Sequence, residues 1–445
     1  MSKKLILIVV DGMTPAAFER AVDGGRAPTL ALLARHGTYR RATSVFPSLT
    51  PVCLSSIVTG GGPDVHRIPH LVWWHREERR IVEYGSSFAA LRAAGMAQSL
   101  TDTIYNMNQQ HLSAGATTVY EALDDAGLVS AAVNITCYRG RTRYLPTLPW
   151  LTKPAYGPKR FYFYGLFESD QTGAPFAVRS RAGGSTDAYV SAVGRWLVTR
   201  DGFDFLAYYL SDFDYSSHLH GPEGAEDVAL ARTDAAVQSL LDAAGGGDAF
   251  LERYAVVLLS DHGQTTVERT AQLQAPFAGL EHDVVVTASN RSGQLYLRRT
   301  ALVDAGTLAE RLDGQAAVEV TLRREGVDAV ARRAGEELRF RPDGDGWATT
   351  GDAGILDHPD ALGRSWAALA NPNAGELLVS AAEGWEFTDL GGRHHAGGGS
   401  HGSLVAGDST VPVLTIGMDA DIRRITDVTP AVRTFFGVDV TADAR

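Results

Sequence analysis

Four short segments of the sequence place carboxylate or imidazole groups directly after an apolar run or inside a glycine-rich loop. Asp11 follows the run 5–10, and the other segments are residues 212–218, 261–263 and 397–402. Oxygen and nitrogen ligands of these kinds bind borderline divalent metals such as Zn²⁺ without any thiolate. Taken singly, each segment is equally well explained as a turn or a solvated loop. Taken together, they predict a metal site.

Electrostatics also points to bound cations near three of these carboxylates, Asp11, Asp214 and Asp261. If they converge, one like-charge pair at about 4 Å costs roughly 4 kcal/mol at an effective dielectric constant near 20. Three such pairs would rival the stability of a whole domain, about 5–15 kcal/mol. The cluster must therefore be protonated or neutralised, and two divalent cations neutralise it directly.

The candidate nucleophile is Thr50, in the segment Phe46-Pro47-Ser48-Leu49-Thr50-Pro51. Thr followed by Pro, by helix-forming residues and then by Gly60 is typical of the N-cap, N1 and C′ positions of a short helix. The hydroxyl then lies at a helix N-terminus, which favours an anion. Thr50 is either a cap alone or a nucleophile. Since metal coordination activates a weakly nucleophilic hydroxyl, the ligand-rich segments elsewhere favour the second role.

The elements that must position these groups have the pattern of an α/β fold. Apolar runs of strand length alternate with longer helical patterns, which predicts a mostly parallel central sheet with helices on both faces. Ligands bind at the carboxyl ends of strands in such sheets, so the four segments should meet at one edge. The expected strands are residues 5–10, 129–135, 203–209, 255–259 and 411–416, and the expected helices are residues 15–34, 117–126, 186–197 and 225–243.

Two stretches interrupt this alternation. Residues 138–183 are rich in proline, aromatic and basic side chains, which either grip the leaving group of a substrate or pack against the core. Residues 268–395 predict a small α+β insertion, with strands at 294–297 and 376–379 and a helical stretch near 327–338. A catalytic core of residues 1–267 and 396–445 would then carry this insertion as a cap over the substrate site, or as surface decoration.

Composition narrows the class of protein. Of 445 residues, 41 are Lys or Arg and 52 are Asp or Glu, and the net charge of −11 argues against a surface that coats nucleic acid. Two cysteines leave no disulfide framework and no Cys-rich zinc finger. No apolar run reaches the roughly 18 residues that cross a bilayer, and the run after Lys4 lacks a cleavage site. We therefore expect a cytoplasmic protein.

In their order and spacing, these motifs resemble the alkaline phosphatase superfamily and, within it, the nucleotide pyrophosphatase/type I phosphodiesterase family. The resemblance runs from residue 4 to about residue 417 and is weakest in the insertion. The motifs that carry it are Asp11, Phe46-Pro47-Ser48-Leu49-Thr50-Pro51, Asp214-x-x-x-His218, Asp261-His262-Gly263 and His401-Gly402.

This resemblance implies a hydrolase of phosphodiester or nucleotide pyrophosphate bonds with two zinc ions, or with Mn²⁺ in their place. Its substrate would be a small-molecule phosphate ester or nucleotide. Thr50 would attack phosphorus, and a water activated at the first metal would hydrolyse the resulting phosphothreonine. The ligands that it implies are Asp214, His218 and His401 for one ion, and Asp11, Asp261, His262 and the Thr50 oxygen for the other.

One position departs from the pattern of the family. Its phosphodiesterase members carry Asn three residues after the nucleophile, where the amide donates to a phosphate oxygen. Cys53 stands at this position and is a far weaker donor, although its backbone N–H is open to the same role. We assign Cys53 to substrate binding on this basis. The departure leaves three alternatives: a phosphomonoesterase, a phosphonate hydrolase, or a metal-binding homologue without turnover.

Overall fold

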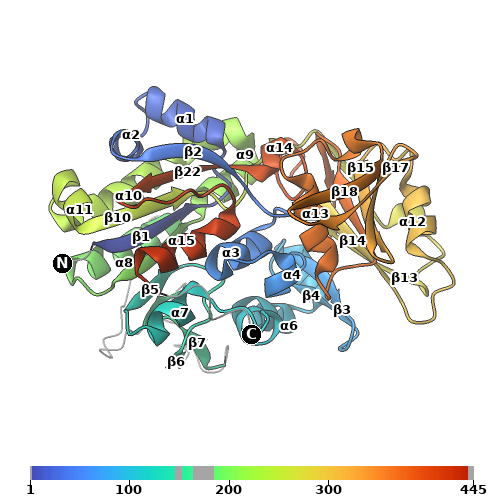
Figure 1. Cartoon of the computed structure of the whole chain (residues 1–445), viewed down its shortest axis with the longest axis horizontal. Helices are drawn as coiled ribbons and strands as arrows, with labels where there is room; N and C mark the ends of the chain where they lie inside the picture. The colour runs from blue at the N-terminus through green and yellow to red at the C-terminus, as the bar shows by residue number, and fades with distance from the viewer. Residues whose placement is uncertain (1–2, 146–152, 164–184, 439–445) are drawn as a thin grey trace.

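The computed structural model describes residues 3–145, 153–163 and 185–438. It contains two sheets of seven strands each, which lie at opposite ends of the long axis of the molecule (Figure 1). The first is the core sheet, and its strands come from both sides of the insertion in the sequence. The second lies entirely within residues 268–395.

The core sheet has the strand order β2-β22-β10-β1-β9-β5-β8. The five strands from β10 to β8 are parallel, whereas β22 pairs antiparallel with both β10 and the edge strand β2. This mostly parallel sheet confirms the predicted fold class. Its strands are β1 (Lys4–Val10), β2 (Thr38–Thr43), β5 (Ser130–Val133), β8 (Arg160–Tyr162), β9 (Phe205–Leu210), β10 (Tyr254–Leu259) and β22 (Thr410–Ile416).

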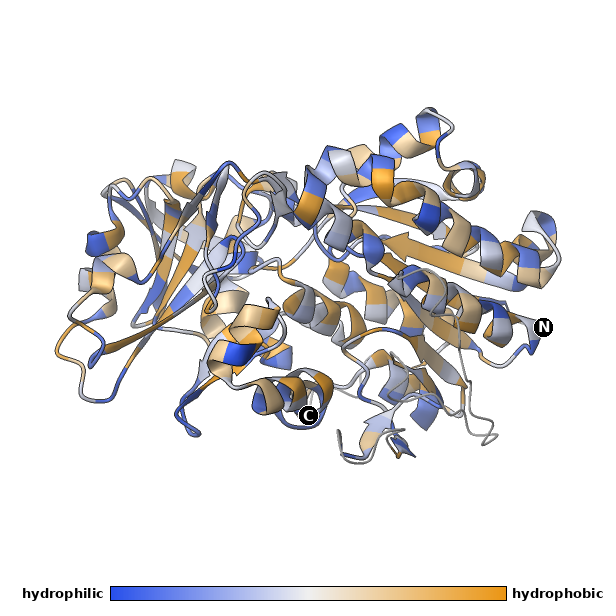
Figure 2. Ribbon diagram, turned by 180° about the vertical axis from the view of Figure 1, so that it is seen from behind, coloured by the Kyte–Doolittle hydropathy of each residue, from blue (hydrophilic) through white to orange (hydrophobic). Residues whose placement is uncertain are grey.

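Strand β1 shows why both faces of the core sheet are covered by helices. Leu5, Leu7 and Val9 lie in one apolar core, and the alternate residues of the strand lie in a second. This two-sided burial explains the continuous hydrophobicity of the central strands, which are largely orange in Figure 2. The first face is closed by α3 (Thr50–Thr59), α7 (Val119–Asp125) and α15 (Val428–Phe435), and the second by α1 (Pro15–Asp23), α2 (Pro28–Arg35), α8 (Thr186–Thr199), α10 (Leu230–Ala244) and α11 (Gly247–Arg253).

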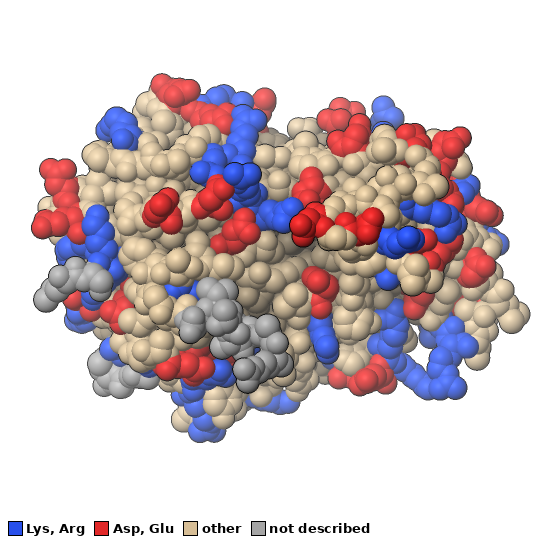
Figure 3. All heavy atoms as spheres, viewed as in Figure 1, with Lys and Arg blue, Asp and Glu red and all other residues tan. Residues whose placement is uncertain are grey.

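Further helices and strand pairs connect these layers. No helix in the described ranges is both long enough and apolar enough to cross a membrane. Over the face drawn in Figure 3, Lys and Arg are interspersed with Asp and Glu. The connecting elements include α4 (Pro63–His66), α5 (Phe88–Ala94), α6 (Met96–Thr101), a π-helix (Asp102–His111) and α9 (Asp212–Val228), with the strand pairs β3 (Val72–His75) and β4 (Arg80–Glu83), and β6 (Thr142–Tyr144) and β7 (Ala155–Gly157).

The second domain is built on a fully antiparallel sheet with the order β13-β14-β19-β15-β16-β17-β18. An apolar core lies on each of its faces, one closed by α12 (Ala305–Leu312) and the other by α13 (Ala361–Ala370). Its strands are β13 (Val284–Ser289), β14 (Ser292–Leu297), β15 (Val318–Glu325), β16 (Asp328–Arg333), β17 (Glu336–Asp343), β18 (Gly346–Gly351) and β19 (Leu377–Ala381).

Three predicted helices are wrong in detail. The helix expected over 225–243 covers the end of α9 and most of α10. The stretch 327–338 forms the hairpin of β16 and β17, because Ala334 and Gly335 both adopt positive φ (52° and 86°), as a tight two-residue turn requires. The single helix expected over 15–34 is two helices, α1 and α2. Pro28 begins the second, after Gly25 has taken a left-handed φ of 66°.

The described part of the segment 138–183 packs against the core. Tyr138, Tyr144 and Phe161 are buried in the core that α3 and α7 close, and Arg139 pairs with Glu121 of α7 at 3.1 Å. These contacts favour the packing alternative over a grip on the substrate. Residues 146–152 and 164–183 of this segment lie outside the described residues.

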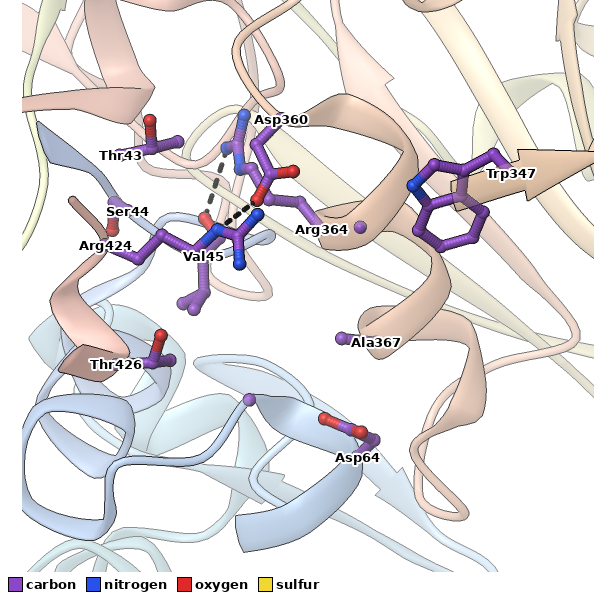
Figure 4. Close-up of a pocket in the computed structure, with 12 residues that line it drawn as sticks. Thr43, Ser44, Val45, Asp64, Trp347, Asp360, Arg364, Ala367, Arg424 and Thr426 are labelled. Atoms are coloured by element: carbon purple, nitrogen blue, oxygen red, sulfur yellow. Dashed lines mark hydrogen bonds and ion pairs between the residues drawn. The ribbon is translucent and has the colours of Figure 1, made fainter. Parts of the chain in front are cut away.

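A cavity of about 260 Å³ lies where the second domain meets the core (Figure 4). Arg364 of α13 is only 4% exposed there, and its guanidinium donates to the carbonyl oxygens of Val45 and Leu404. Arg424 pairs across the same boundary with Asp360 at 2.7 Å. The buried hydrogen bonds of Arg364 and the more exposed pair of Arg424 with Asp360 attach the second domain to the core.

Candidate metal centre

Three adjacent strands of the core sheet bring the predicted carboxylates to one edge. Val9 of β1 is in register with Leu259 of β10, and Val10 with Leu210 of β9, so the three strands end side by side. Asp11, Asp214 and Asp261 follow these ends, which point toward the second domain in Figure 1. The parallel topology therefore makes neighbours of residues that are far apart in the sequence.

His401 reaches the same edge from the opposite direction. It lies in the loop that returns from the insertion and leads to β22, an antiparallel strand that begins where its neighbour β10 ends. The His401 ring is 2% exposed and stacks on the His262 ring, with 3.6 Å between centroids and 9° between planes. The two imidazoles thus lie face to face at the same edge of the sheet.

The first group of candidate ligands, named here the His218 cluster, consists of Asp214, His218 and His401. Asp214 and His218 are four residues apart on one face of α9, with His218 Nε2 3.3 Å from Asp214 Oδ2. His401 Nε2 lies 3.8 Å from the other oxygen of Asp214. One potential ligand atom from each residue lies within 4.8 Å of the others, a spacing that suits a single metal ion.

The second group, named here the Asp261 cluster, consists of Asp11, Asp261, His262 and Thr50. His262 Nε2 is its centre, at 3.3 Å from Asp11 Oδ1, 3.5 Å from Asp261 Oδ2 and 3.1 Å from Thr50 Oγ1. Asp214 also lies within 4.8 Å of Asp11 and His262, so it stands between the two clusters. All seven residues predicted from the sequence are therefore brought together.

The three imidazoles share one orientation. In each, Nδ1–H donates to a backbone carbonyl: His218 to Gly399 at 2.8 Å, His262 to Gly263 at 3.1 Å, and His401 to Ser48 at 2.7 Å. A carbonyl only accepts hydrogen bonds, so the proton is assigned to Nδ1, and Nε2 faces the carboxylates. Histidines that bind metals are usually held in this way by a partner at the other ring nitrogen.

No Lys or Arg in the described ranges pairs with the two carboxyl groups of the Asp261 cluster. Burial, together with the neighbouring Asp214 and Asp261, raises the pKa of Asp11 well above its usual value, and burial raises the pKa of Asp261. Among the described residues, Asp11 Oδ1 and Asp261 Oδ2 have no hydrogen-bond partner although both are buried. Unpartnered oxygens beside an imidazole nitrogen fit a divalent cation such as Zn²⁺.

The His218 cluster compensates its own charge. Burial opposes ionisation of Asp214, yet the imidazoles of His218, His401 and His262 hold its pKa well below the usual value. Burial likewise opposes the charge on His218, but the Asp214 carboxylate raises the pKa of His218 to about 9. The pKa of His401 lies well below its usual value because of burial and the adjacent His262.

Thr50 is the first residue of α3, and Leu49 rather than Thr50 is the N-cap. The helix therefore starts one residue earlier than predicted, with Pro51 still inside its first turn, where proline is tolerated. Gly60 ends it at φ 72°, as predicted. Because Thr50 does not cap the helix, its hydroxyl is free to contact His262.

Cys53 has a partner for each of its polar groups. Its Sγ lies 3.3 Å from Ser44 Oγ, and its backbone N–H donates to the Leu49 carbonyl at 2.9 Å. The side chain is fully buried, and this burial raises the pKa of the thiol well above its usual value. The N–H expected to be open is thus used by the helix, and the role of Cys53 in substrate binding stays a prediction.

Three further side chains touch the predicted ligands. The hydroxyl of Tyr209 donates to Asp11, the amide of Gln264 donates to Asp214, and Asn290 Nδ2 lies 3.0 Å from His401 Nε2. Gln264 was detectable because it follows the Asp261-His262-Gly263 motif directly. Asn290 lies in a turn of the second domain, and nothing in its sequence context indicated a role.

Gly12 owes its identity to the crowding at the centre. It adopts φ 68°, and a Cβ atom there would lie 2.7 Å from Gln264 Nε2 and 2.9 Å from Asp214 Oδ1. A side chain at this position would displace the carboxylate that stands between the two clusters. Glycine is therefore required for the close approach as well as for the turn.

A mostly parallel α/β sheet that gathers carboxylates, imidazoles and a helix-borne threonine at its carboxyl edge defines a class of metal-dependent hydrolases. The sequence matches the family described as type I phosphodiesterase / nucleotide pyrophosphatase over residues 5–404. The chain belongs to this family, and so to the phosphodiesterase/nucleotide pyrophosphatase-type hydrolases of the alkaline phosphatase superfamily.

Solved structures share the fold at low sequence identity. Murine ectonucleotide pyrophosphatase / phosphodiesterase 5 is 13% identical, with a TM-score of 0.61 over 98% of this chain and 96% of that one. Phosphonoacetate hydrolase from Sinorhizobium meliloti, in complex with phosphonoformate, is 19% identical, with a TM-score of 0.62 over 99% and 96%. A search of curated proteins found no match.

Proposed function

We propose that this protein hydrolyses phosphodiester or nucleotide pyrophosphate bonds, with Thr50 as the nucleophile at a centre of two zinc ions. The observation that carries the proposal is the position of Thr50 Oγ1, 3.1 Å from His262 Nε2. His262 Nε2 also contacts two buried carboxylate oxygens that have no hydrogen-bond partner in the described part of the chain. A helix-borne hydroxyl in this place is suited to attack a phosphorus atom.

In this mechanism the chain holds and orients the reacting groups. Asp214, His218 and His401 would hold one ion, and Asp11, Asp261 and His262 the other. Bound divalent ions supply Lewis acidity and lower the pKa of a hydroxyl or a water. Thr50 Oγ forms a bond to phosphorus as the bond to the leaving oxygen breaks. The phosphorus keeps its second ester group and is now esterified to Thr50, and the leaving alcohol or phosphate takes up the proton that the threonine hydroxyl loses. Water then breaks the threonine–phosphorus bond and restores the hydroxyl.

Charge balance supports a diester as the substrate. Three aspartates and an ionised Thr50 equal the charge of two divalent ions, so the loaded centre is neutral. In the described ranges, Asp11, Asp214 and Asp261 form ion pairs with histidines only, and no Lys or Arg lies within 4 Å of their oxygens. A diester brings one negative charge to this site and a monoester brings nearly two, so the diester is the easier to accommodate.

Two solved structures of similar fold indicate which classes of substrate to test. An inactive variant of murine ectonucleotide pyrophosphatase / phosphodiesterase 5 was solved in complex with AMP, at 12% identity and a TM-score of 0.62. The phosphonoacetate hydrolase complex makes phosphonates the second substrate class to examine. At these identities both likenesses concern the fold alone, so the substrate remains our inference.

The experiment that tests the proposal compares hydrolysis of an aryl phosphodiester with that of the matching aryl phosphomonoester, with zinc supplied. Thr50→Ala serves as the blank, and Thr59→Ala, a threonine at the other end of the same helix, as the matched control. We expect a diester preference of at least about tenfold, or 1.4 kcal/mol in transition-state free energy. A monoester preference would make the protein a phosphomonoesterase. Activity on neither, with both metals bound, would leave phosphonates or a metalloprotein without turnover.

A further inference from the structure

The turn between β13 and β14 carries the second domain into the metal centre. Asn290 and Arg291 form this turn, and the backbone N–H of Arg291 donates to the His401 carbonyl at 2.9 Å. The Arg291 guanidinium, fully buried, pairs at 2.9 Å with Asp408 in the short helix α14 (Ala406–Ser409), which follows the His401 loop. Phe387 N–H donates to the Asn290 carbonyl at 2.8 Å. The turn is therefore held on both sides, and Asn290 has a fixed place beside His401.

The side chain of Asn290 also has a fixed orientation. Its Oδ1 accepts a hydrogen bond from Ser289 Oγ at 2.9 Å, so that the NH₂ group is the end that faces His401 Nε2 at 3.0 Å. Because His401 Nδ1–H is already donated to the Ser48 carbonyl, Nε2 carries the lone pair that accepts from the amide. The residue is only 5% exposed, so this donor lies inside the centre and away from bulk water.

The acceptor of this amide is the atom that the proposed function assigns to a metal ion. His401 Nε2 cannot accept from Asn290 while its lone pair is bound to a metal. Asp214 Oδ1, which lies 3.8 Å from His401 Nε2, already accepts from the Gln264 amide. In the loaded protein, Asn290 Nδ2–H is thus a buried donor that needs a new acceptor, since a buried donor left without a partner is unfavourable.

We propose that Asn290 is a substrate-binding residue, whose Nδ2–H donates to a non-bridging oxygen of a monoanionic phosphoryl or phosphonyl group at the centre. This inference rests on the proposed function. The amide is neutral, so it adds a hydrogen bond without adding the positive charge that would favour a dianion. The second domain then contributes directly to substrate recognition, beyond the shape that it gives to the site.

The alternative role for Asn290 is purely structural, namely to orient His401. The two roles predict different losses. An orienting residue affects the metal that His401 holds, whereas a substrate-binding residue affects anion affinity and leaves metal content unchanged. Metal content and anion binding must therefore be measured separately from turnover.

Two substitutions suit the left-handed conformation of Asn290, which has φ 57°. Asn290→Gly removes the amide without backbone strain, and Asn290→Asp keeps the shape but replaces the donor with a charged acceptor. Asn373→Ala removes a carboxamide of the same domain that donates to the Arg67 carbonyl, and it serves as the control.

The test uses the full chain loaded with zinc, in a Thr50→Ala background that prevents turnover. The probe is phenyl methylphosphonate, a monoanion, titrated by calorimetry, and zinc is counted by mass spectrometry. We expect two zinc ions per chain in every variant. The affinity for the probe should be about tenfold lower for Asn290→Gly, about a hundredfold lower for Asn290→Asp, and unchanged for Asn373→Ala.

In the Thr50 enzyme, the same two Asn290 substitutions should raise KM for the diester more than they lower kcat. Three results would overturn the role of Asn290. The first is an affinity of Asn290→Gly for the probe like that of the parent, and the second is a loss of bound zinc in proportion to the loss of affinity for the probe. The third is no binding of the probe to the parent. The binding assay involves no turnover, so it judges Asn290 even if the comparison of diester and monoester goes against the proposed function.

Discussion

In the His218 cluster one carboxylate faces two imidazoles, whereas in the Asp261 cluster two carboxylates face a single imidazole. Asp214 is consequently ionised, with its pKa well below the usual value, and His218 is held near a pKa of 9. The pKa values of Asp11 and Asp261 are raised instead, and within the described residues one oxygen of each has no hydrogen-bond partner. The two clusters lie side by side and share Asp214, yet they differ in how their charge is balanced.

The ligands of the two metal positions therefore differ in how far they are preorganised before a metal binds. The His218 cluster can keep its arrangement through its own ion pairs, because its charges are of both signs. The Asp261 cluster has excess negative charge in a fully buried place, and only protons or a cation can relieve it. It also holds Thr50, so the reactive hydroxyl belongs to the cluster that depends more strongly on metal.

The largest effect is expected from Thr50→Ala. Turnover of the aryl diester should fall by about 10³-fold or more, while zinc content stays near that of the parent, because the substitution removes the nucleophile and no side-chain charge. Steady-state kinetics and metal analysis measure both quantities. Thr50→Ser, which keeps a hydroxyl, should retain part of the activity. Near-full activity in Thr50→Ala would remove Thr50 from the mechanism.

The next largest effect concerns how the stability of the metal-free protein depends on pH. The raised pKa of His218 means that the folded state binds more protons than the unfolded state between pH 6.5 and about 9. The free energy of unfolding should therefore fall as pH rises through this window, by up to about 3 kcal/mol. Urea titrations in the presence of a chelator measure this slope. His218→Gln should remove it, and an unchanged slope would show that another group is responsible.

His401→Ala should reveal whether the clusters bind metal independently. We expect the affinity for one zinc ion to fall about a hundredfold, roughly 2.7 kcal/mol, while the second ion is retained by Asp11, Asp261 and His262. Equilibrium dialysis against buffered zinc gives the two affinities. Equal loss of both ions would mean that the ligands are wrongly divided between the clusters.

In the metal-free protein, removal of one carboxylate charge should change the free energy of unfolding in opposite directions in the two clusters. Asp261→Asn should stabilise the metal-free protein by about 1–2 kcal/mol, because it relieves repulsion with Asp11. Asp214→Asn should destabilise it by a similar amount, because two imidazoles lose their carboxylate partner. Thermal and urea unfolding of chelator-treated protein test this contrast, and changes of the same sign would contradict it.

The smallest effect is expected at Cys53, which belongs to neither cluster. Cys53→Ser keeps a small polar side chain next to Ser44, so kcat/KM for the diester should change by less than about threefold. A loss of about tenfold or more in KM, with metal content unchanged, would restore the role in substrate binding that the resemblance assigned to this position.

Much of the core could be predicted from the sequence because its determinants are local. The central strands are continuous apolar runs, and each ligand except Thr50 and His401 lies in a short motif next to one of them. Strand β2 was missed because its sequence, Thr-Tyr-Arg-Arg-Ala-Thr, is that of a polar edge strand, and β8 because it has only three residues. The hairpin at 327–338 was missed because Ala and Arg favour helices, whereas pairing with neighbouring strands decides the outcome.

The contribution of the second domain to the centre could not be predicted in this way. Asn290 meets His401 through a turn whose position depends on the packing of two domains, and these residues are 111 positions apart in the chain. The balance of charge between the clusters also depends on three-dimensional neighbours, since Asp11, Asp214 and Asp261 are the same kind of residue in the sequence but differ in pKa.

The pairing of β2 with β22 has a consequence for synthesis of the chain on the ribosome. Thr38 of β2 pairs with Thr415 of β22, so β2 must wait for its partner strand while almost the whole chain is translated. At about 5–20 residues per second, this delay lasts roughly 20–75 s. An unpaired strand can recruit strands of other chains, and charged side chains discourage such pairing. Arg40 and Arg41, in the middle of β2, would then protect the nascent chain from aggregation until β22 is made.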